Sequence, residues 1–407
     1  MPKILQINSA INYGSTGKIA EQIGLLAMQN GWDSYIAHGR YINPSESKSI
    51  QIGNQLDWTC HALMTRIIDR HGLFSTCATK KLIKQIQNIK PDIIHLHNIH
   101  GYYINYKILF KYLRKANIPV VWTLHDCWSM TGHCTHFESA KCDKWQSGCY
   151  NCPQKKEYPS SLIIDRSKRN YIEKKQYFSS IKNLTLVPVS NWIANVVQRS
   201  FLENANVSVI HNGIDVQVFN TCYNENLVEQ YKIYDKRVIL GVASPWSDKK
   251  GLPDFVKLYE QLPKHIYQIV LIGLSDEQIK SLPKGIIGLC RTNSATELAQ
   301  WYSLADVFVN PTYEDTYPTT NLEAISCGTP VITYRTGGSP ESVTPLTGRV
   351  VEQGDLEGVV KAIEELCAED REEMRKRCRE YAVAHFDKRE CFEKYIELYE
   401  RILNKNK

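Results

Sequence analysis

The sequence predicts an α/β protein with two parallel, doubly wound sheets. A chain of 407 residues is too long for one ordinary hydrophobic core and suits two domains. Short apolar runs alternate with helical patterns from beginning to end, as is typical of parallel sheets covered by helices. A polar stretch between Phe219 and Arg237 interrupts this alternation near the middle of the chain and marks the expected domain boundary.

The expected strands are the short apolar runs. In order they are Ile4–Ile7, Ser34–Ala37, Ile93–Leu96, Val120–Leu124, Leu186–Val189 and Val207–Ile210, then Val238–Val242, Gln268–Ile272, Ile286–Leu289, Val307–Asn310 and Val331–Thr333. From about residue 355 onward the chain is charged and almost wholly helical. We therefore expect domains over residues 1–221 and 222–384, followed by a C-terminal helix over 385–407.

Composition excludes several classes of protein. With 43 % hydrophobic and 23 % charged residues the chain is globular, and no segment approaches the roughly 20 apolar residues that span a bilayer. The start, MPKILQINSA, has the pattern of a strand and not of a signal peptide, so we expect a cytoplasmic protein. Thirteen cysteines without an export signal favour reduced thiols. No motif suggests a nucleic-acid partner.

Charge is divided unevenly along the chain. Residues 1–221 carry 25 Lys and Arg against 14 Asp and Glu, whereas the remainder carries 24 against 29. Two predicted helices near residues 80–90 and 107–115 combine basic and apolar faces. Each helix alone has the pattern of an ordinary solvated surface, but the asymmetry of the whole half favours peripheral contact with an anionic membrane surface, on the inner face of the cytoplasmic membrane, or with an acidic acceptor.

Residues 310–341 carry the clearest chemical pattern. A buried strand leads into a loop with Glu314 and Asp315, and a helix that starts near Thr319–Asn321 carries Glu323. Unpaired N–H groups at a helix start suit a diphosphate. Carboxylates beside it can accept hydrogen bonds from sugar hydroxyls, which a site for phosphate alone would not need. The segment therefore predicts a sugar-nucleotide site, although a solvated acidic loop is the commoner use of such residues.

Three further motifs follow predicted strands. Gly14 and Gly17 open a helix, where glycines allow close approach of an anion or simply form a tight turn. His125 ends the strand VVWTLHD, at the sheet edge where ligands of such folds bind. Lys250 lies in a loop before Gly251, and Gly338 in a Gly-Gly turn. Of the histidines near residue 97, we expect a mainly structural role.

Together these motifs resemble the family 4 retaining glycosyltransferases of the GT-B fold. The resemblance covers nearly the whole chain and rests on two carboxylates with seven residues between them, a Cys-Gly-Thr-Pro-Val run and the Asn-Gly-Ile-Asp signature at Asn212–Asp215. It implies two facing Rossmann-like domains with an interdomain cleft, and a last helix that returns to the N-terminal domain. It also implies a nucleoside diphosphate sugar donor and a glycan or lipid-linked acceptor, with no cofactor required for catalysis.

The resemblance also assigns roles to the candidate residues. His125 would contact the donor sugar near the reacting carbon, and either Glu314 or Asp315 would bind its hydroxyls. The other implied donor-binding residues are Gly14, Gly17, Lys250, Thr319, Thr320, Asn321, Glu323 and Gly338. The family has an Arg soon after the glycine that corresponds to Gly241, and this Arg is absent here. Lys249 or backbone amides would then help Lys250 to neutralise the diphosphate.

A cysteine-rich loop over residues 127–153 departs from the general family. Cys134, Cys142, Cys149 and Cys152 occur within nineteen residues, and four thiolates can close a tetrahedral zinc site. His133 and His136 are reserve ligands. The alternative is four free thiols, but so polar a loop would lack a core without a staple. We expect a structural metal here and not a catalytic one.

Two other functions remain open from the sequence alone. A nucleotide-sugar 2-epimerase has the same double-domain architecture and needs no acceptor. A noncatalytic sugar-nucleotide-binding protein would also use these loops. The basic N-terminal half disfavours the first, and the intact acidic and histidine positions disfavour the second.

Overall fold

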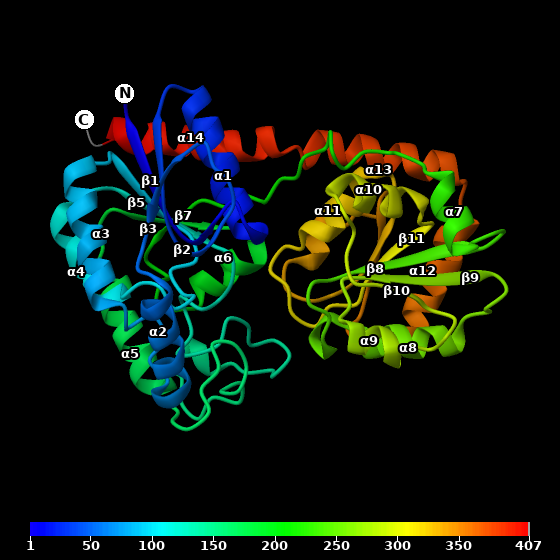
Figure 1. Ribbon diagram of the computed structural model, residues 1–407, viewed down its shortest axis with the longest axis horizontal. Coiled ribbons are helices and arrows are strands. Elements are labelled where there is room, and N and C mark those ends of the chain that lie inside the picture. The colour runs from blue at the N-terminus through cyan, green and yellow to red at the C-terminus, as the bar shows by residue number, and fades with distance from the viewer. Residues whose placement is uncertain (406–407) are drawn as a thin grey trace. The chain divides into compact units, whose positions relative to one another are not determined.

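The computed structural model describes residues 1–405 and contains two compact units, each built around one parallel sheet (Figure 1). The first unit comprises Met1–His211 together with the residues from Phe392 onward, and the second comprises Asn212–Cys391. Because every strand pairs in parallel, each loop that follows a strand opens at the same edge of its sheet, called here the carboxyl edge.

The first unit holds a seven-stranded sheet in the order β3-β2-β1-β4-β5-β6-β7. Its central strands are buried along their whole length, which explains their continuous apolar runs. The strands are β1 (Lys3–Ile11), β2 (Asp33–Ile42), β3 (Lys48–Gln51), β4 (Ile93–Leu96), β5 (Val120–Leu124), β6 (Leu184–Pro188) and β7 (Asn206–Val207). The helices are α1 (Gly14–Gln29), α2 (Gln55–Ile68), α3 (Thr76–Ile89), α4 (Tyr106–Ala116), α5 (Ser167–Phe178) and α6 (Asn191–Gln198).

The second unit holds a six-stranded sheet in the order β10-β9-β8-β11-β12-β13. Its strands are β8 (Arg237–Val242), β9 (Tyr267–Ile272), β10 (Ile287–Leu289), β11 (Val307–Asn310), β12 (Val331–Tyr334) and β13 (Gly348–Val351). Its helices are α7 (Glu225–Tyr231), α8 (Leu252–Gln261), α9 (Asp276–Ser281), α10 (Ala295–Leu304), α11 (Thr319–Ser326), α12 (Leu356–Ala368) and α13 (Arg371–His385). The prediction of two doubly wound sheets is confirmed.

Two strands were not predicted. β3 and β13 lie at the edges of their sheets, and at most one residue of each is apolar and fully buried. Such short edge strands lack the apolar run on which the prediction relied. At the opposite edge of the first sheet, a strand was expected over Val207–Ile210. The observed strand β7 covers only Asn206–Val207, so it begins one residue earlier and ends three residues earlier than expected.

The unit boundary lies ten residues before the expected one, between His211 and Asn212. The reason is that residues 212–221 pack within the second unit. Ile214 forms a β-bridge with Asp387, and Arg379 of α13 donates hydrogen bonds to the carbonyls of Val216 and Phe219.

The last helix, α14 (Lys388–Lys405), contributes its later turns to the first unit. The hydroxyl of Tyr399 bonds Nδ1 of His95 at 2.7 Å, and that of Tyr395 bonds Thr123 Oγ1 at 3.1 Å. His95 is therefore a structural residue, bound between α14 and Thr123. Within residues 1–405, no helix combines the length and the apolar character needed to cross a bilayer.

Candidate functional site

Two lysine–carboxylate pairs lie at the carboxyl edge of the second sheet. Lys249 and Lys250 lie in the 3-10 turn Asp248–Lys250 that follows β8, and Glu314 and Asp315 follow the neighbouring strand β11. Lys249 Nζ lies 3.1 Å from Glu314 Oε2, and Lys250 Nζ lies 2.7 Å from Asp315 Oδ2. Both lysines are about one-third exposed, so an incoming anion can reach them.

Gly251 fixes these lysines against the acidic loop. Its φ of +77° is left-handed, and a Cβ at this position would lie 2.3 Å from the carbonyl oxygen of Pro311. Only glycine permits this approach. Tyr313 N also donates to Lys249 O at 2.8 Å. The two loops therefore form one rigid platform.

The start of α11 lies beside this platform. Its N-cap is Pro318, which provides no side-chain cap, and the first turn contains no acidic residue. The partial positive charge of the helix start is thus not offset by its own side chains. Thr319 and Thr320 are half-buried there. This arrangement suits an anionic group.

The side chain of Asn321, a residue of the expected donor-binding helix start, is committed to structural hydrogen bonds. It is fully buried, its Oδ1 accepts from Asn310 at 2.8 Å, and its Nδ2 donates to Ser339 and Ser342. These hydrogen bonds occupy both the oxygen and the nitrogen of the side-chain amide. Asn321 thereby ties the end of β11 to the turn that follows β12.

Glu323 lies one turn further along α11. The hydroxyl of buried Tyr302 donates to Glu323 Oε2 at 3.1 Å. Burial and the nearby carboxylate raise the pKa of Tyr302 well above its usual value, so Tyr302 remains a donor. The Gly337-Gly338 turn follows β12, and Gly338 N donates to the carbonyl of Asp315 at 3.2 Å. The turn and the acidic loop are thereby joined at the same edge.

The glycine loop of the first unit follows β1. Gly14 has a φ of +64° and starts α1, whose N-cap Tyr13 makes no side-chain cap. A Cβ on Gly17 would lie 3.3 Å from Asn12 N and 3.4 Å from Ala10 O. Gly17 therefore allows close packing of the loop on the strand, while Gly14 provides the turn itself.

His125 is the end of a hydrogen-bonded chain that begins inside the first sheet. Gln6 of β1 donates from Nε2 to Ala20 O at 2.8 Å, which orients its amide. Gln6 Oε1 then lies 2.9 Å from His97 Nε2, and His97 Nδ1 lies 3.1 Å from His125 Nε2. The strand order β1-β4-β5 brings these three residues together.

This chain determines which nitrogens carry protons. Because Gln6 offers an oxygen, His97 Nε2 must donate, and neutral His97 then accepts at Nδ1. His125 consequently donates from Nε2 and carries a lone pair on Nδ1. Burial lowers the pKa of His125 to about 4 and that of His97 well below its usual value, so both rings are neutral at pH 7.

The segment after His125 is held by buried charges. Asp126 accepts from His100 Nε2 at 2.8 Å and from Trp128 N at 2.8 Å. Although burial opposes it, His100 lowers the pKa of Asp126 to about 2. Lys174 of α5 is buried and donates to the carbonyls of Trp128 and Thr131, and burial lowers its pKa to about 7.

The cysteine-rich loop lies beyond this segment and contains only one short 3-10 turn, Lys144–Gln146. Its four expected metal ligands line a single cavity: Cys134, Cys142, Cys149 and Cys152. His133 lines the same cavity. In the part of the chain that the structure describes, no group of three His, Cys, Asp or Glu side chains has a preformed metal-binding arrangement.

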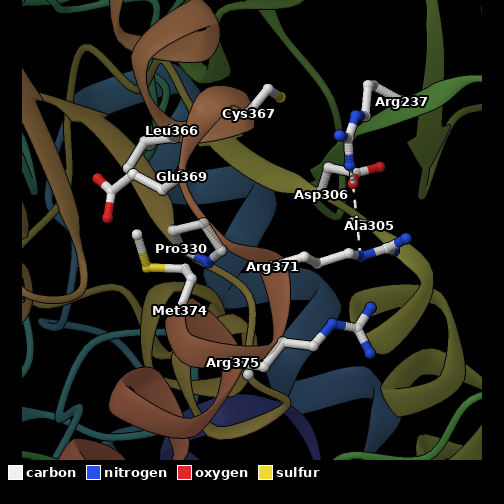
Figure 2. A pocket seen from close by; sticks show the side chains of 11 residues that line it. Arg237, Ala305, Asp306, Pro330, Leu366, Cys367, Glu369, Arg371, Met374 and Arg375 are labelled. Atoms are coloured by element: carbon white, nitrogen blue, oxygen red, sulfur yellow. Dashed lines mark hydrogen bonds and ion pairs between the residues drawn. The ribbon is translucent and has the colours of Figure 1, made fainter.

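A pocket at the opposite, amino edge of the second sheet has a structural explanation (Figure 2). Arg237 and Arg371 point toward Asp306, with nitrogen–oxygen distances of 2.9 and 3.4 Å. Arg371 and Arg375 also donate to the last carbonyls of α10. Cations at a helix C-terminus stabilise it, and this pocket therefore anchors α13 to α10.

Gln6, His97 and Lys174 were not predicted as parts of the site. The available signal was a glutamine inside the otherwise apolar run Ile4–Ile7, because a buried amide needs a specific partner. His97 was predicted to be structural, and its bond to His125 gives it a place beside the candidate site.

Two family models match the chain. Residues 51–218 match the model described as Glycosyltransferase Family 4, and residues 224–385 match the one described as Glycosyl transferases group 1. A protein of Escherichia coli (strain K12) named as a colanic acid biosynthesis glycosyl transferase, WcaC, is 24 % identical over 381 residues. That alignment covers 87 % of this chain and 88 % of the relative. The epimerase alternative is not favoured by these matches.

Solved structures show the same fold. Sucrose-phosphate synthase from Thermosynechococcus elongatus matches with a TM-score of 0.73 and 17 % identity, over 99 % of this chain and all of that one. Anabaena Alr3699/HepE, solved with UDP-glucose, matches with a TM-score of 0.67 and 14 % identity, over 98 % of this chain and 99 % of that one. The predicted GT-B fold is confirmed.

Proposed function

We propose that the chain is a group 1 glycosyltransferase that transfers a sugar from a nucleoside diphosphate sugar to an acceptor hydroxyl with retention at the anomeric carbon, and the two family matches support this proposal. One observation carries the proposal. Lys250, Asp315 and the start of α11 lie at one sheet edge, where they offer a cation, a carboxylate and helix N–H groups to a single ligand. A sugar diphosphate needs all three.

The diphosphate takes the place beside Lys250 and the start of α11. In the reaction the bond between the anomeric carbon and the diphosphate oxygen breaks, a bond to the acceptor oxygen forms, and the acceptor proton goes to the departing diphosphate. Lys250 and the helix start stabilise the negative charge that develops on this leaving group. Glu323 accepts hydrogen bonds from the ribose, and its contact with Tyr302 holds the carboxylate in place.

Of the two acidic candidates, we propose Asp315 as the residue that binds the sugar hydroxyls. Its side chain is 19 % exposed, whereas that of Glu314 is 7 % exposed. Asp315 is also the residue that seven intervening residues separate from Glu323, as in the family pattern. Glu314 then serves to hold Lys249. Asp315→Asn should lower turnover far more than Glu314→Gln, and the reverse order in kcat/KM would exchange their roles.

His125 contributes a neutral imidazole to the donor sugar. The chain from Gln6 through His97 holds the ring of His125 in one orientation and one tautomer, with Nε2 as the donor to His97. A cation there would repel the oxocarbenium-like charge that develops at the anomeric carbon. The low pKa of His125 therefore suits the reaction.

The acceptor is proposed to be a glycan or a lipid-linked oligosaccharide, presented at an anionic membrane surface. The support is a set of exposed basic residues on the adjacent helices α3 and α4: Lys80, Lys81, Lys84, Lys111, Arg114 and Lys115. Sedimentation with anionic vesicles, but not with zwitterionic ones, is expected, and replacing the three α3 lysines with Glu should remove it. Equal sedimentation with both vesicle types would contradict this part of the proposal.

The activity is tested with a panel of nucleotide sugars, starting with UDP-glucose because a solved structural relative carries it. Nucleoside diphosphate should be released only when an acceptor extract is added, and the product linkage should keep the donor's anomeric configuration by NMR. Release of a rearranged nucleotide sugar without acceptor would indicate an epimerase. Binding without turnover under every condition would indicate a noncatalytic protein.

A further inference from the structure

We propose that the cysteine-rich loop of the first unit binds one structural zinc ion in the cavity shared by Cys134, Cys142, Cys149, Cys152 and His133. This site is separate from the transfer site, and its proposal does not depend on the donor or the acceptor. It rests on four thiols and one imidazole that line one cavity, on the environment of His133 and on the scarcity of regular secondary structure in the loop.

Four cysteine side chains of the loop converge on one cavity. The four cysteines are spread over nineteen residues of a loop without helix or strand beyond one 3-10 turn, yet all four line one cavity. The thiols of Cys134 and Cys152 are hydrogen-bonded to each other. In a tetrahedral zinc–thiolate site the sulfurs lie about 3.8 Å apart, as bonds of about 2.3 Å require, which is close to a thiol–thiol contact.

His133 has the environment of a metal-binding histidine. Its side chain is completely buried, and Nδ1 bonds Asp69 Oδ1 at 2.6 Å. Its other nitrogen, Nε2, is buried without a hydrogen-bond partner. A carboxylate that orients a histidine while the second nitrogen stays available is the usual environment of a metal-binding histidine. An orphan nitrogen inside a cavity lined by thiols indicates a missing ligand.

The cysteine-rich loop has little regular structure to stabilise it. Residues 127–166 contain few regular backbone hydrogen bonds, and the loop carries several charged side chains. Gly132 N donates to Cys149 Sγ at 3.1 Å, a contact of the kind that stabilises a thiolate ligand. Because the side chains do not form a preformed group of three ligands, metal binding would have to draw the sulfurs together. The metal would thus fold the loop tightly, as in small zinc domains.

The metal content of the purified full-length protein tests the proposal. After purification under reducing conditions in zinc-supplemented medium, about one zinc per chain is expected by mass spectrometry of the metal. Co²⁺ added to the metal-free protein should give a sulfur-to-cobalt charge-transfer band. Less than about a tenth of an equivalent of any transition metal in folded protein, with no cobalt band, would overturn the proposal.

Variants separate this site from adventitious binding. Cys149→Ser and Cys152→Ser should each lower the retained zinc at least several-fold, whereas Cys60→Ser, at an exposed position of the same unit, should retain it. His133→Asn tests whether the histidine replaces one of the cysteines as a ligand, because zinc loss in this variant assigns Nε2 as a ligand and retention assigns four thiolates. A Cys134–Cys152 disulfide in the native protein would contradict the zinc site, and peptide mapping without reduction detects it.

Discussion

The carboxyl edges of the two sheets share one topology but use opposite chemistry. The edge of the second sheet is ionic, with two lysine–carboxylate pairs that remain partly exposed. The edge of the first sheet instead holds a largely buried chain of uncharged groups, Gln6, His97 and His125, called here the neutral edge, which ends beside the carboxylate of Asp126. In the proposed reaction, the ionic edge would suit the charged diphosphate of a donor, whereas the uncharged imidazole of His125 would suit a carbon at which positive charge develops.

Loss of Glu323 is expected to have the largest effect. If Glu323 accepts two hydrogen bonds from the ribose, as proposed, Glu323→Ala removes both, each worth about 2 kcal/mol, and kcat/KM should fall about 1,000-fold. Tyr302→Phe is the matched control, since it removes the contact that holds Glu323 but keeps the carboxylate, and its loss should be much smaller. Full turnover by a folded Glu323→Ala protein, checked by its thermal unfolding, would refute the role of the ionic edge in donor binding.

Lys250→Ala should come next, with kcat lowered about 100-fold, because it removes one preorganised cation from the leaving group. Lys249→Ala is the control within the same turn and should lower kcat far less, as Lys249 pairs with the more buried Glu314. If the two variants lose equal activity, the lysines act only by general charge, and the activity lost in each should then become smaller at high salt.

The sequence predicted the local motifs well and their partners poorly. The runs Ile93–Leu96 and Val120–Leu124 match β4 and β5 because central strands are buried on both faces and therefore continuous in apolar residues. The helix that carries Glu323 was predicted from its own short segment. The bond between Gln6 and His97 joins residues 91 positions apart, and only the strand order reveals it.

Gln6→Leu tests the neutral edge directly. Without the amide oxygen, His97 can adopt either tautomer, and His125 loses its enforced orientation. We expect kcat at pH 7 to fall about tenfold, which corresponds to about 1.4 kcal/mol. His95→Gln is the matched control: His95 is buried beside His97 but bonds Tyr399 and Thr123, so this variant should lower stability without a comparable loss of kcat per folded molecule.

The smallest expected effect is a shift in pH dependence. Because burial lowers the pKa of His125 to about 4, its neutral form persists as pH falls through 6.5, and activity that depends on it should be lost only near pH 4. Gln6→Glu keeps an acceptor for His97 but adds a negative charge, which favours the protonated form of the paired rings. The acid limb of kcat/KM should therefore move upward by about one pH unit in this variant.

The stability of the folded protein should also decrease as pH falls from about 6.5 to about 4. In this range the unfolded chain binds a proton at His125, whereas the folded protein does so only near pH 4, so acid favours unfolding. An acid limb near pH 6.5 in the unaltered enzyme, assigned to His125 by its absence in His125→Asn, would show that this edge carries charge during turnover and would remove the contrast between the two sheets.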